Sequence, residues 1–274
     1  MGWSPIEREK DWPRGDPSGI RGNPPVSGVL TITLNSANRL LKWLMNTDKV
    51  YVGIMKLHET IDIKEVYNIM KEFETVVYQT PPMKSAVKRS IRKRRIYSFI
   101  PLETDSNYVL FKAHVESGTY IRKLCFDVGE AVGVGINMVE LRRIRSGVFD
   151  ESHAVTLNQL AYYASVYKET GESSELTKLL NPIEEMLVDK PLIIVRGSAK
   201  KNLYTGASLS IRGVVCVSND IKSGGEAFVC SENGELIEVA RCLRNAEELR
   251  GIESGIVATP IRVLEPINVD AGVS

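Results

Sequence analysis

The sequence predicts a mixed α/β (α+β) chain that ends in a small β-barrel. Up to about residue 188, hydrophobic runs with helical spacing alternate with β-branched runs typical of strands. Beyond Pro191, short β-branched runs alternate with Gly and Asn turns. The chain has 274 residues, of which 43% are hydrophobic and 25% charged. This composition fits one large or two modest globular domains and excludes a disordered, collagen-like or coiled-coil protein.

The first part of the chain yields a series of expected elements. Residues 1–25 contain five prolines and four glycines without hydrophobic periodicity, so we expect an irregular leader. Asp62 stands where it would cap a following helix, and Gly133 where it would end one. Strands are expected at 29–34, 50–57, 97–100 and 109–115, helices at 38–45, 63–73, 120–132, 157–167 and 174–180, and a strand or short helix at 138–145.

The last part of the chain has the spacing of a small barrel. Strands are expected at 192–195, 208–211, 214–217, 227–230, 236–240 and 256–260, with short helices near Leu203 and Glu247. Near residue 188 the sequence changes from mixed helical and strand-like runs to short strand-like runs separated by turns. We therefore predict one domain over 26–188 and a second over 189–274.

The cysteines and the hydropathy limit the function classes. Cys125, Cys216, Cys230 and Cys242 are too far apart for a CxxC zinc knuckle, so we expect no metal site. No apolar run reaches the length of about 18 residues that a membrane helix needs. The N-terminus lacks the apolar core of a signal peptide. We therefore expect a soluble, cytoplasmic protein without a membrane partner.

The charge is distributed unevenly, although Lys and Arg total 35 against 34 Asp and Glu. Residues 76–101 contain no acid and seven bases, which are Lys84, Lys88, Arg89, Arg92, Lys93, Arg94 and Arg95. A solvated surface is the simpler interpretation, but the bases would repel one another without a polyanion. We predict that they bind nucleic acid through phosphates, which supplies affinity and little sequence choice.

A second candidate site lies in the segment GTYIR. Gly118 allows a tight turn, and Tyr120 and Arg122 follow it. An isolated arginine is most often a surface ion pair. Beside an aromatic residue it could also bind a carboxylate or phosphate through two parallel hydrogen bonds.

Four segments in order resemble the TruB/dyskerin pseudouridine synthases, specifically their archaeal and eukaryotic H/ACA type. They are YVGIMKLH at 51–58, TPPMKSAVKR at 80–89, GTYIR at 118–122 and ELRRIRSG at 140–147. The end of the chain resembles the PUA domain of that family, with Gly206, Ala207 and Leu209 in its RNA-facing turn. The resemblance covers about residues 22–266 and implies a pseudouridine synthase catalytic domain followed by a PUA β-barrel.

The resemblance also implies a reaction and a set of site residues. The family isomerises uridine to pseudouridine in RNA without a metal or organic cofactor, on a base flipped out of its stack. By their places in the motifs, Tyr51 would stack on the base, Tyr120 would be the active-site tyrosine, Arg122 would pair with the catalytic aspartate, and Leu141 would line the uracil pocket. The implied partners are RNA (tRNA, rRNA or an H/ACA guide RNA) and H/ACA ribonucleoprotein subunits.

One motif departs from the family pattern. The family segment GHxGTLDPxxxGxL corresponds here to RGNPPVSGVL at 21–30, which places Asn23 at the position of the aspartate, and the GHxGT stretch is missing. We therefore expect an N-terminally shortened catalytic domain whose leader keeps a degenerate catalytic loop. An amide is a poor nucleophile and a very weak base, so isomerase activity should be weak or lost.

Three alternatives to this expectation stay open. Asp16 could loop back and act in place of the missing aspartate. The chain could be a non-catalytic RNA-binding scaffold of the same fold. It could also be a PUA-bearing translation or tRNA-handling factor without any relation to uridine chemistry.

Overall fold

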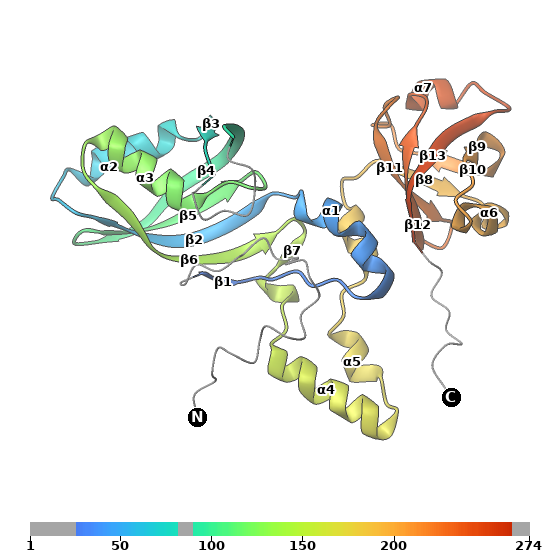
Figure 1. Cartoon of the computed structure of the whole chain (residues 1–274), viewed down its shortest axis with the longest axis horizontal. Coiled ribbons are helices and arrows are strands. Elements are labelled where there is room, and N and C mark those ends of the chain that lie inside the picture. The colour runs from blue at the N-terminus through green and yellow to red at the C-terminus, as the bar shows by residue number, and fades with distance from the viewer. Residues whose placement is uncertain (1–25, 82–89, 265–274) are drawn as a thin grey trace. The chain divides into compact units, whose positions relative to one another are not determined.

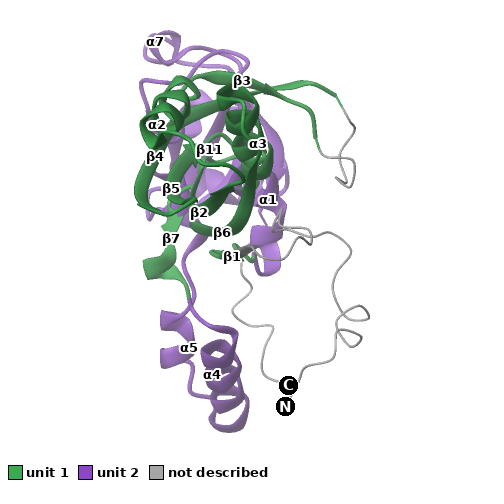
Figure 2. Cartoon of the chain, turned by 90° about the vertical axis from the view of Figure 1, so that its left-hand side faces the viewer, with its two compact units in different colours: residues 1–32, 45–154 green, residues 33–44, 155–274 purple. Residues whose placement is uncertain are grey.

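Our computed structural model describes residues 26–81 and 90–264. Contacts within the chain define two compact units (Figures 1 and 2). Of the described residues, the first unit contains 26–32, 45–81 and 90–154, and the second contains 33–44 and 155–264.

The first unit is a mixed sheet covered on one face by two helices. Its strands are β1 (Val26–Gly28), β2 (Lys49–Leu57), β3 (Val76–Gln79), β4 (Arg92–Asp105), β5 (Tyr108–Val115), β6 (Ile136–Ser146) and β7 (Phe149–Asp150). They are ordered β1-β6-β2-β5-β4-β3, with β7 paired to β6. β1 runs parallel to β6, and the other pairs are antiparallel. Helices α2 (Ile63–Glu72) and α3 (Ile121–Val132) lie over the same face (Figure 1).

Local sequence signals explain these helices well. The Asp62 carboxylate accepts a hydrogen bond of 3.0 Å from the Lys64 N–H and so caps α2, as predicted. Helix α3 ends at Gly133, which adopts the left-handed conformation with φ of +76°. The apolar faces of both helices pack on the sheet in one core, whose fully buried members include Met55, Val66, Met70, Phe99, Phe111, Leu124 and Val128.

The structure corrects the first expected strand. Residues 29–34 form no strand, and the three-residue β1 precedes them. Val29 still donates its N–H to the Arg143 carbonyl of β6 at 2.8 Å, but no described strand pairs with the residues after it, and Leu30, Ile32 and Leu34 are largely exposed. The helix expected at 38–45 is a 3₁₀ helix over Asn35–Leu40 followed by α1 (Leu41–Met45). The sequence also missed β3, which forms only by pairing with β4.

The second unit contains the short strands that the sequence predicted. They are β8 (Leu192–Val195), β9 (Leu209–Ser210), β10 (Val214–Val217), β11 (Glu226–Ser231), β12 (Leu236–Cys242) and β13 (Ile256–Val263), ordered β10-β8-β11-β12-β13-β9. The helices are α4 (Leu157–Thr170), α5 (Ser174–Lys178), α6 (Lys200–Tyr204) and α7 (Ala246–Leu249). The last two are the expected short helices near Leu203 and Glu247.

Residues 33–44 pack on the sheet of the second unit, although they are far from its strands in the sequence. The Trp43 indole N–H donates to Glu226 Oε2 at 2.7 Å, and the ring contacts Phe228 edge-on with centroids 6.4 Å apart. Arg39 donates to the Val263 carbonyl at 2.9 Å. The contacts therefore group these residues with the second unit, whereas the linear division at 188/189 stays a prediction.

Glu238 gives the second unit an expected pH dependence. Its side chain is fully buried in β12, and neither carboxylate oxygen has a hydrogen-bond partner among the described residues. Burial raises its pKa from 4.5 to about 7. A raised carboxyl pKa means that the folded state holds its proton longer than the unfolded state does. The stability of the second unit should therefore fall as the pH rises from about 4.5 to about 7.

We expect Glu238→Gln to stabilise the second unit by about 3 kcal/mol above pH 7.5 and to have little effect near pH 4.5. The amide imitates the protonated acid and has no charged form to bury. Denaturant unfolding at both pH values measures this difference. Glu253→Gln, which changes an exposed carboxylate, is the matched control and should leave both midpoints in place. A Glu238→Gln effect that does not depend on pH would contradict the expectation.

Candidate functional site

Two of the predicted site residues lie on adjacent strands of the first sheet. Tyr51 in β2 stands opposite Arg143 in β6, and Gly53, two residues later, stands opposite Leu141. A Cβ atom on Gly53 would lie 2.6 Å from Phe111 Cζ and 3.0 Å from Leu141 Cδ1. The glycine of this motif is therefore needed so that Leu141 and Phe111 can pack over the strand.

Arg143 organises the surroundings of Tyr51. Its side chain is buried, and its Nε donates a hydrogen bond of 2.7 Å to the Val29 carbonyl. It also hydrogen-bonds to Tyr51. Burial raises the pKa of the Tyr51 hydroxyl, and the nearby guanidinium opposes that rise. The phenol therefore stays protonated and held in place at neutral pH.

Sequence reasoning did not select Arg143, although it lies in the ELRRIRSG segment. The available signal was its position two residues after Leu141, because residues i and i+2 of a strand share one face. A buried guanidinium must also be hydrogen-bonded, and here it connects Val29, the residue after β1, to Tyr51.

Strand β1 ties the chain that follows Asn23 to the strand of Leu141. Val26 pairs with Leu141, and Gly28 pairs with Arg143. Gly28 has φ of +99°, and a Cβ atom there would lie 2.1 Å from the Arg143 carbonyl oxygen. Only glycine fits at this position. Asn23 stands three residues before Val26 and lies outside the described residues, so its predicted place in the site stays a prediction.

Tyr120 and Arg122 flank a residue that anchors them to the same core. Ile121 is buried in the cluster that contains Leu141 and against which Tyr51 packs. Tyr120 is half-buried immediately before α3, whereas Arg122 in the first turn is exposed. Arg122 forms no hydrogen bond or ion pair with any of the residues that the structure describes. The predicted role of Arg122 in binding an anion stays a prediction.

The basic block is divided between the two faces of β4. Arg92 and Arg94 are half-buried, and Lys93 and Arg95 are exposed. Arg94 forms an ion pair of 3.5 Å with Glu116, and only 19% of its side chain is exposed. Lys93 Nζ lies 5.6 Å from the centre of the Tyr78 ring.

Among the four arginines and lysines of β4, Lys93 and Arg95 are thus the best placed for phosphates. Lys84, Lys88 and Arg89 lie outside the described residues. Because side chains alternate between the two faces of a strand, the position of β4 determines that Lys93 and Arg95 are exposed while Arg92 and Arg94 are half-buried.

The second unit holds the remaining predicted RNA contact. Gly206 follows α6, is exposed and has φ of +83°. Its backbone N–H donates to the Leu203 carbonyl at 2.8 Å, and Leu209 is buried behind the turn. An exposed turn of this kind lets another backbone approach closely. The RNA-facing role of Gly206 stays a prediction.

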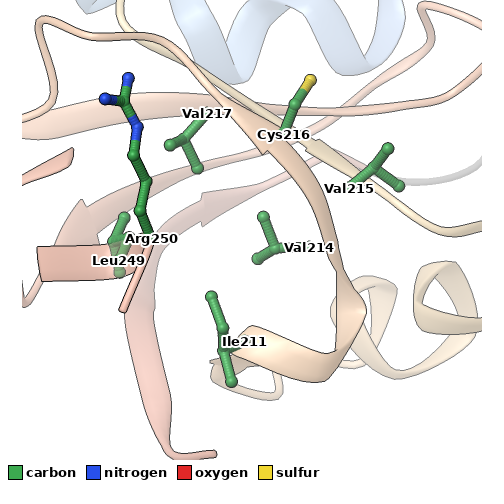
Figure 3. Close-up of a pocket in the computed structure, with 7 residues that line it drawn as sticks. All are labelled: Ile211, Val214, Val215, Cys216, Val217, Leu249 and Arg250. Atoms are coloured by element: carbon green, nitrogen blue, oxygen red, sulfur yellow. The ribbon is translucent and has the colours of Figure 1, made fainter. Parts of the chain in front are cut away.

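A separate pocket of about 330 Å³ also lies in the second unit (Figure 3). It is lined by Ile211, Val214, Val215, Cys216, Val217, Leu249 and Arg250. None of the predicted site residues lines it. In the part of the chain that the structure describes, no group of His, Cys, Asp or Glu side chains is placed to bind a metal, and no helix has the length and apolarity to cross a membrane.

Comparison with protein families assigns almost the whole described chain. Residues 23–121 match the TruB family pseudouridylate synthase N-terminal domain, residues 122–188 match the tRNA pseudouridylate synthase B C-terminal domain, and residues 191–264 match the PUA domain. The first of these matches begins at Asn23.

Full-length relatives agree with the domain matches. A probable tRNA pseudouridine synthase B of Korarchaeum cryptofilum is 42% identical over 244 residues, which cover 89% of this chain and 75% of the relative. One of Pyrobaculum calidifontis is 41% identical, with 89% and 73% covered.

Solved structures show the same similarity. A chain of a Cbf5-Nop10-Gar1 complex has a TM-score of 0.82 at 36% identity, covering 89% of this chain and 74% of that one. A chain of an H/ACA RNP bound to a substrate RNA containing 2'-deoxyuridine has a TM-score of 0.82 at 32% identity, with 90% and 75% covered. The resemblance drawn from the four motifs is thus confirmed, and the chain belongs to the TruB family of pseudouridine synthases, close to the archaeal tRNA pseudouridine synthase B and Cbf5 type.

Proposed function

We propose that this chain binds uridine-bearing RNA in the site formed by Tyr51, Leu141, Tyr120 and Arg122, and that its isomerase activity is weak or lost at Asn23. The observation that supports binding is that the contacts which position the site residues are present. Arg143 holds Tyr51, Gly53 makes room for Leu141, and Arg122 presents an exposed guanidinium. Such a site offers an aromatic surface to a base and a cation to a neighbouring phosphate.

The expected loss of turnover follows from the chemistry. Isomerisation breaks the bond between C1′ and N1 of uridine, forms one between C1′ and C5, and releases the C5 proton. A carboxylate can attack carbon or accept that proton, and an Asn amide does neither well. In the family, Arg122 would meet the aspartate. This sequence has an uncharged amide at the motif position of that aspartate, so we expect the Arg122 charge to remain available to RNA.

The partners follow from the relatives. The relatives are named tRNA pseudouridine synthases, and the solved structures contain Nop10, Gar1 or a substrate RNA. We propose RNA as the partner of this chain, in the cytoplasm, with H/ACA-type subunits. A non-catalytic RNA-binding scaffold is the second candidate, and Asn23 favours it. Family membership over residues 23–188 argues against a translation factor unrelated to uridine.

Binding to two matched RNA hairpins tests the uridine site. One hairpin has a G·C stem and a seven-nucleotide loop with a single uridine, and the other has an abasic nucleotide in its place. Stacking of one base is worth about 1–3 kcal/mol, so we expect about 5- to 150-fold tighter binding of the uridine hairpin. Fluorescence anisotropy at one fixed salt concentration gives both dissociation constants. Equal affinities would contradict a uridine site.

A further inference from the structure

We infer that Gln79 is a positioning residue, which fixes Tyr120 and Arg122 in the site through a clamp on the Tyr120 backbone, and that Arg94 supports the same loop. This inference rests on the proposed function, because it assigns the two residues to the uridine site. The sequence predicted that Arg94 binds phosphate, whereas this inference assigns it to the support of the uridine site.

The clamp consists of two hydrogen bonds from one side chain. Gln79 is the last residue of β3 and is buried. Its Oε1 accepts from the Tyr120 N–H at 2.9 Å, and its Nε2 donates to the Tyr120 carbonyl at 3.2 Å. The side-chain amide thus binds the Tyr120 backbone as a neighbouring strand would. A buried amide without these partners would be costly, so the two bonds specify the contact.

The clamped residue determines where α3 begins. Tyr120 is extended, with φ of −94° and ψ of 100°, and its side chain does not cap the helix. Ile121 then enters the core, and Arg122 lies in the first turn. A change in the Tyr120 backbone would therefore move both the tyrosine ring and the guanidinium.

Arg94 holds the preceding turn from the other strand of the hairpin. Gly118 has φ of +78°, and a Cβ atom there would lie 3.1 Å from Arg94 Nη2 and 3.2 Å from Arg94 Nε. Glu116 binds the Arg94 guanidinium at 3.5 Å and accepts a 2.8 Å hydrogen bond from the Arg95 N–H. β3 and β4 therefore both contact the 116–120 loop, one through Gln79 and one through Arg94.

This arrangement separates base positioning from phosphate binding. Gln79 pairs with Arg92, and Tyr78 pairs with Lys93, so the two pairs point to opposite faces of the hairpin. Lys93 is exposed on its face, while Gln79 is buried on the other. A variant of each residue should therefore change a different property of RNA binding.

The experiment compares Gln79→Met with Lys93→Gln on the uridine and abasic hairpins. Met has a similar length and cannot form the clamp. We expect Gln79→Met to reduce the uridine-to-abasic affinity ratio by about tenfold, with the salt dependence unchanged. Lys93→Gln should weaken binding of both hairpins equally, lower the salt slope by about one and keep the ratio.

A second variant tests the clamp within one protein. A protonated Glu side chain has one acceptor and one donor and so imitates Gln, whereas its carboxylate has no donor for the Tyr120 carbonyl. Because position 79 is buried, we expect the pKa of a Glu there to lie well above the ordinary Glu value. Gln79→Glu should then keep the affinity ratio at pH 5 and lose it at pH 8, relative to the unaltered chain at each pH. The comparison of Gln79→Glu at the two pH values still tests the clamp if Gln79→Met does not fold.

The outcomes are distinct. An unchanged ratio in Gln79→Met, or a Gln79→Glu ratio that follows the unaltered chain at both pH values, overturns the positioning role and leaves the proposed function intact. An equal loss of affinity for both hairpins indicates general damage and also overturns it. A ratio near one in the unaltered chain removes the proposed function itself and the inference with it.

Discussion

Replacing Gly28 with Ala should destabilise the first unit more than any other single change in its glycines. The new Cβ atom would lie 2.1 Å from the backbone oxygen of Arg143, which no side-chain rotation can relieve. The φ of +99° is also unfavourable for alanine. Relief requires that β1 leave β6. We expect a loss of roughly 4 kcal/mol or more, beyond the usual range for a single substitution.

Denaturant unfolding measures this loss, with Gly133→Ala as the matched control. Gly133 lies in the same unit and also has a positive φ, of +76°, but a Cβ atom there would meet nothing within 4 Å. Its change should cost only about 1–2 kcal/mol, the price of the left-handed conformation. Similar losses in the two variants would show that β1 does not pair with β6 as described.

Replacing Asn23 with Asp should turn a binding protein into a measurable isomerase. The substitution returns a nucleophile and base at the family position and a partner for Arg122. We expect release of tritium from 5-tritiated uridine RNA to rise on the order of a thousandfold over the unaltered chain. It should stay below full family turnover, because the GHxGT stretch is missing and a misplacement of about 1 Å can cost on the order of a hundredfold.

Asn23→Glu is the control for this gain. It supplies the same carboxylate on a side chain longer by one methylene, so the reacting oxygen is displaced by about 1.5 Å. Its tritium release should remain far below that of Asn23→Asp. Equal release from the two variants would show that the length of the acidic side chain at position 23 does not limit the reaction.

The sequence predicts those elements whose signals are local. Asp62 and Gly133 marked the ends of α2 and α3, and the short runs after Pro191 marked the strands of the second unit, because caps, turns and hydrophobic periods lie within the segment itself. β1 and β3 depend instead on strands distant in sequence, β6 and β4. Local propensity accordingly placed a strand at 29–34, where no strand of the described chain pairs beyond Val29.

The residues of the candidate site also fall into those with a local sequence signal and those without one. Tyr51, Tyr120, Arg122 and Leu141 are predicted from motifs at fixed spacing, and their roles stay predictions. Gln79 and Arg143 were missed because their roles consist of hydrogen bonds to backbone groups of other elements, Tyr120 and Val29. Such contacts follow from strand register, which a single sequence does not determine. Gln79 nevertheless stands directly before the TPPM segment, and a polar residue ending a strand there was a usable signal.

The most direct test of the account is tritium release by the unaltered chain. The chain is incubated with 5-tritiated uridine RNA, a guide RNA and the H/ACA partner proteins, and binding of the same RNA is measured in parallel. We expect RNA to be bound while tritium release stays at the level of a reaction without the chain, because Asn23 supplies no carboxylate. Release above trace level that depends on the unaltered chain would contradict the account and would indicate that Asp16 or another carboxylate performs the reaction.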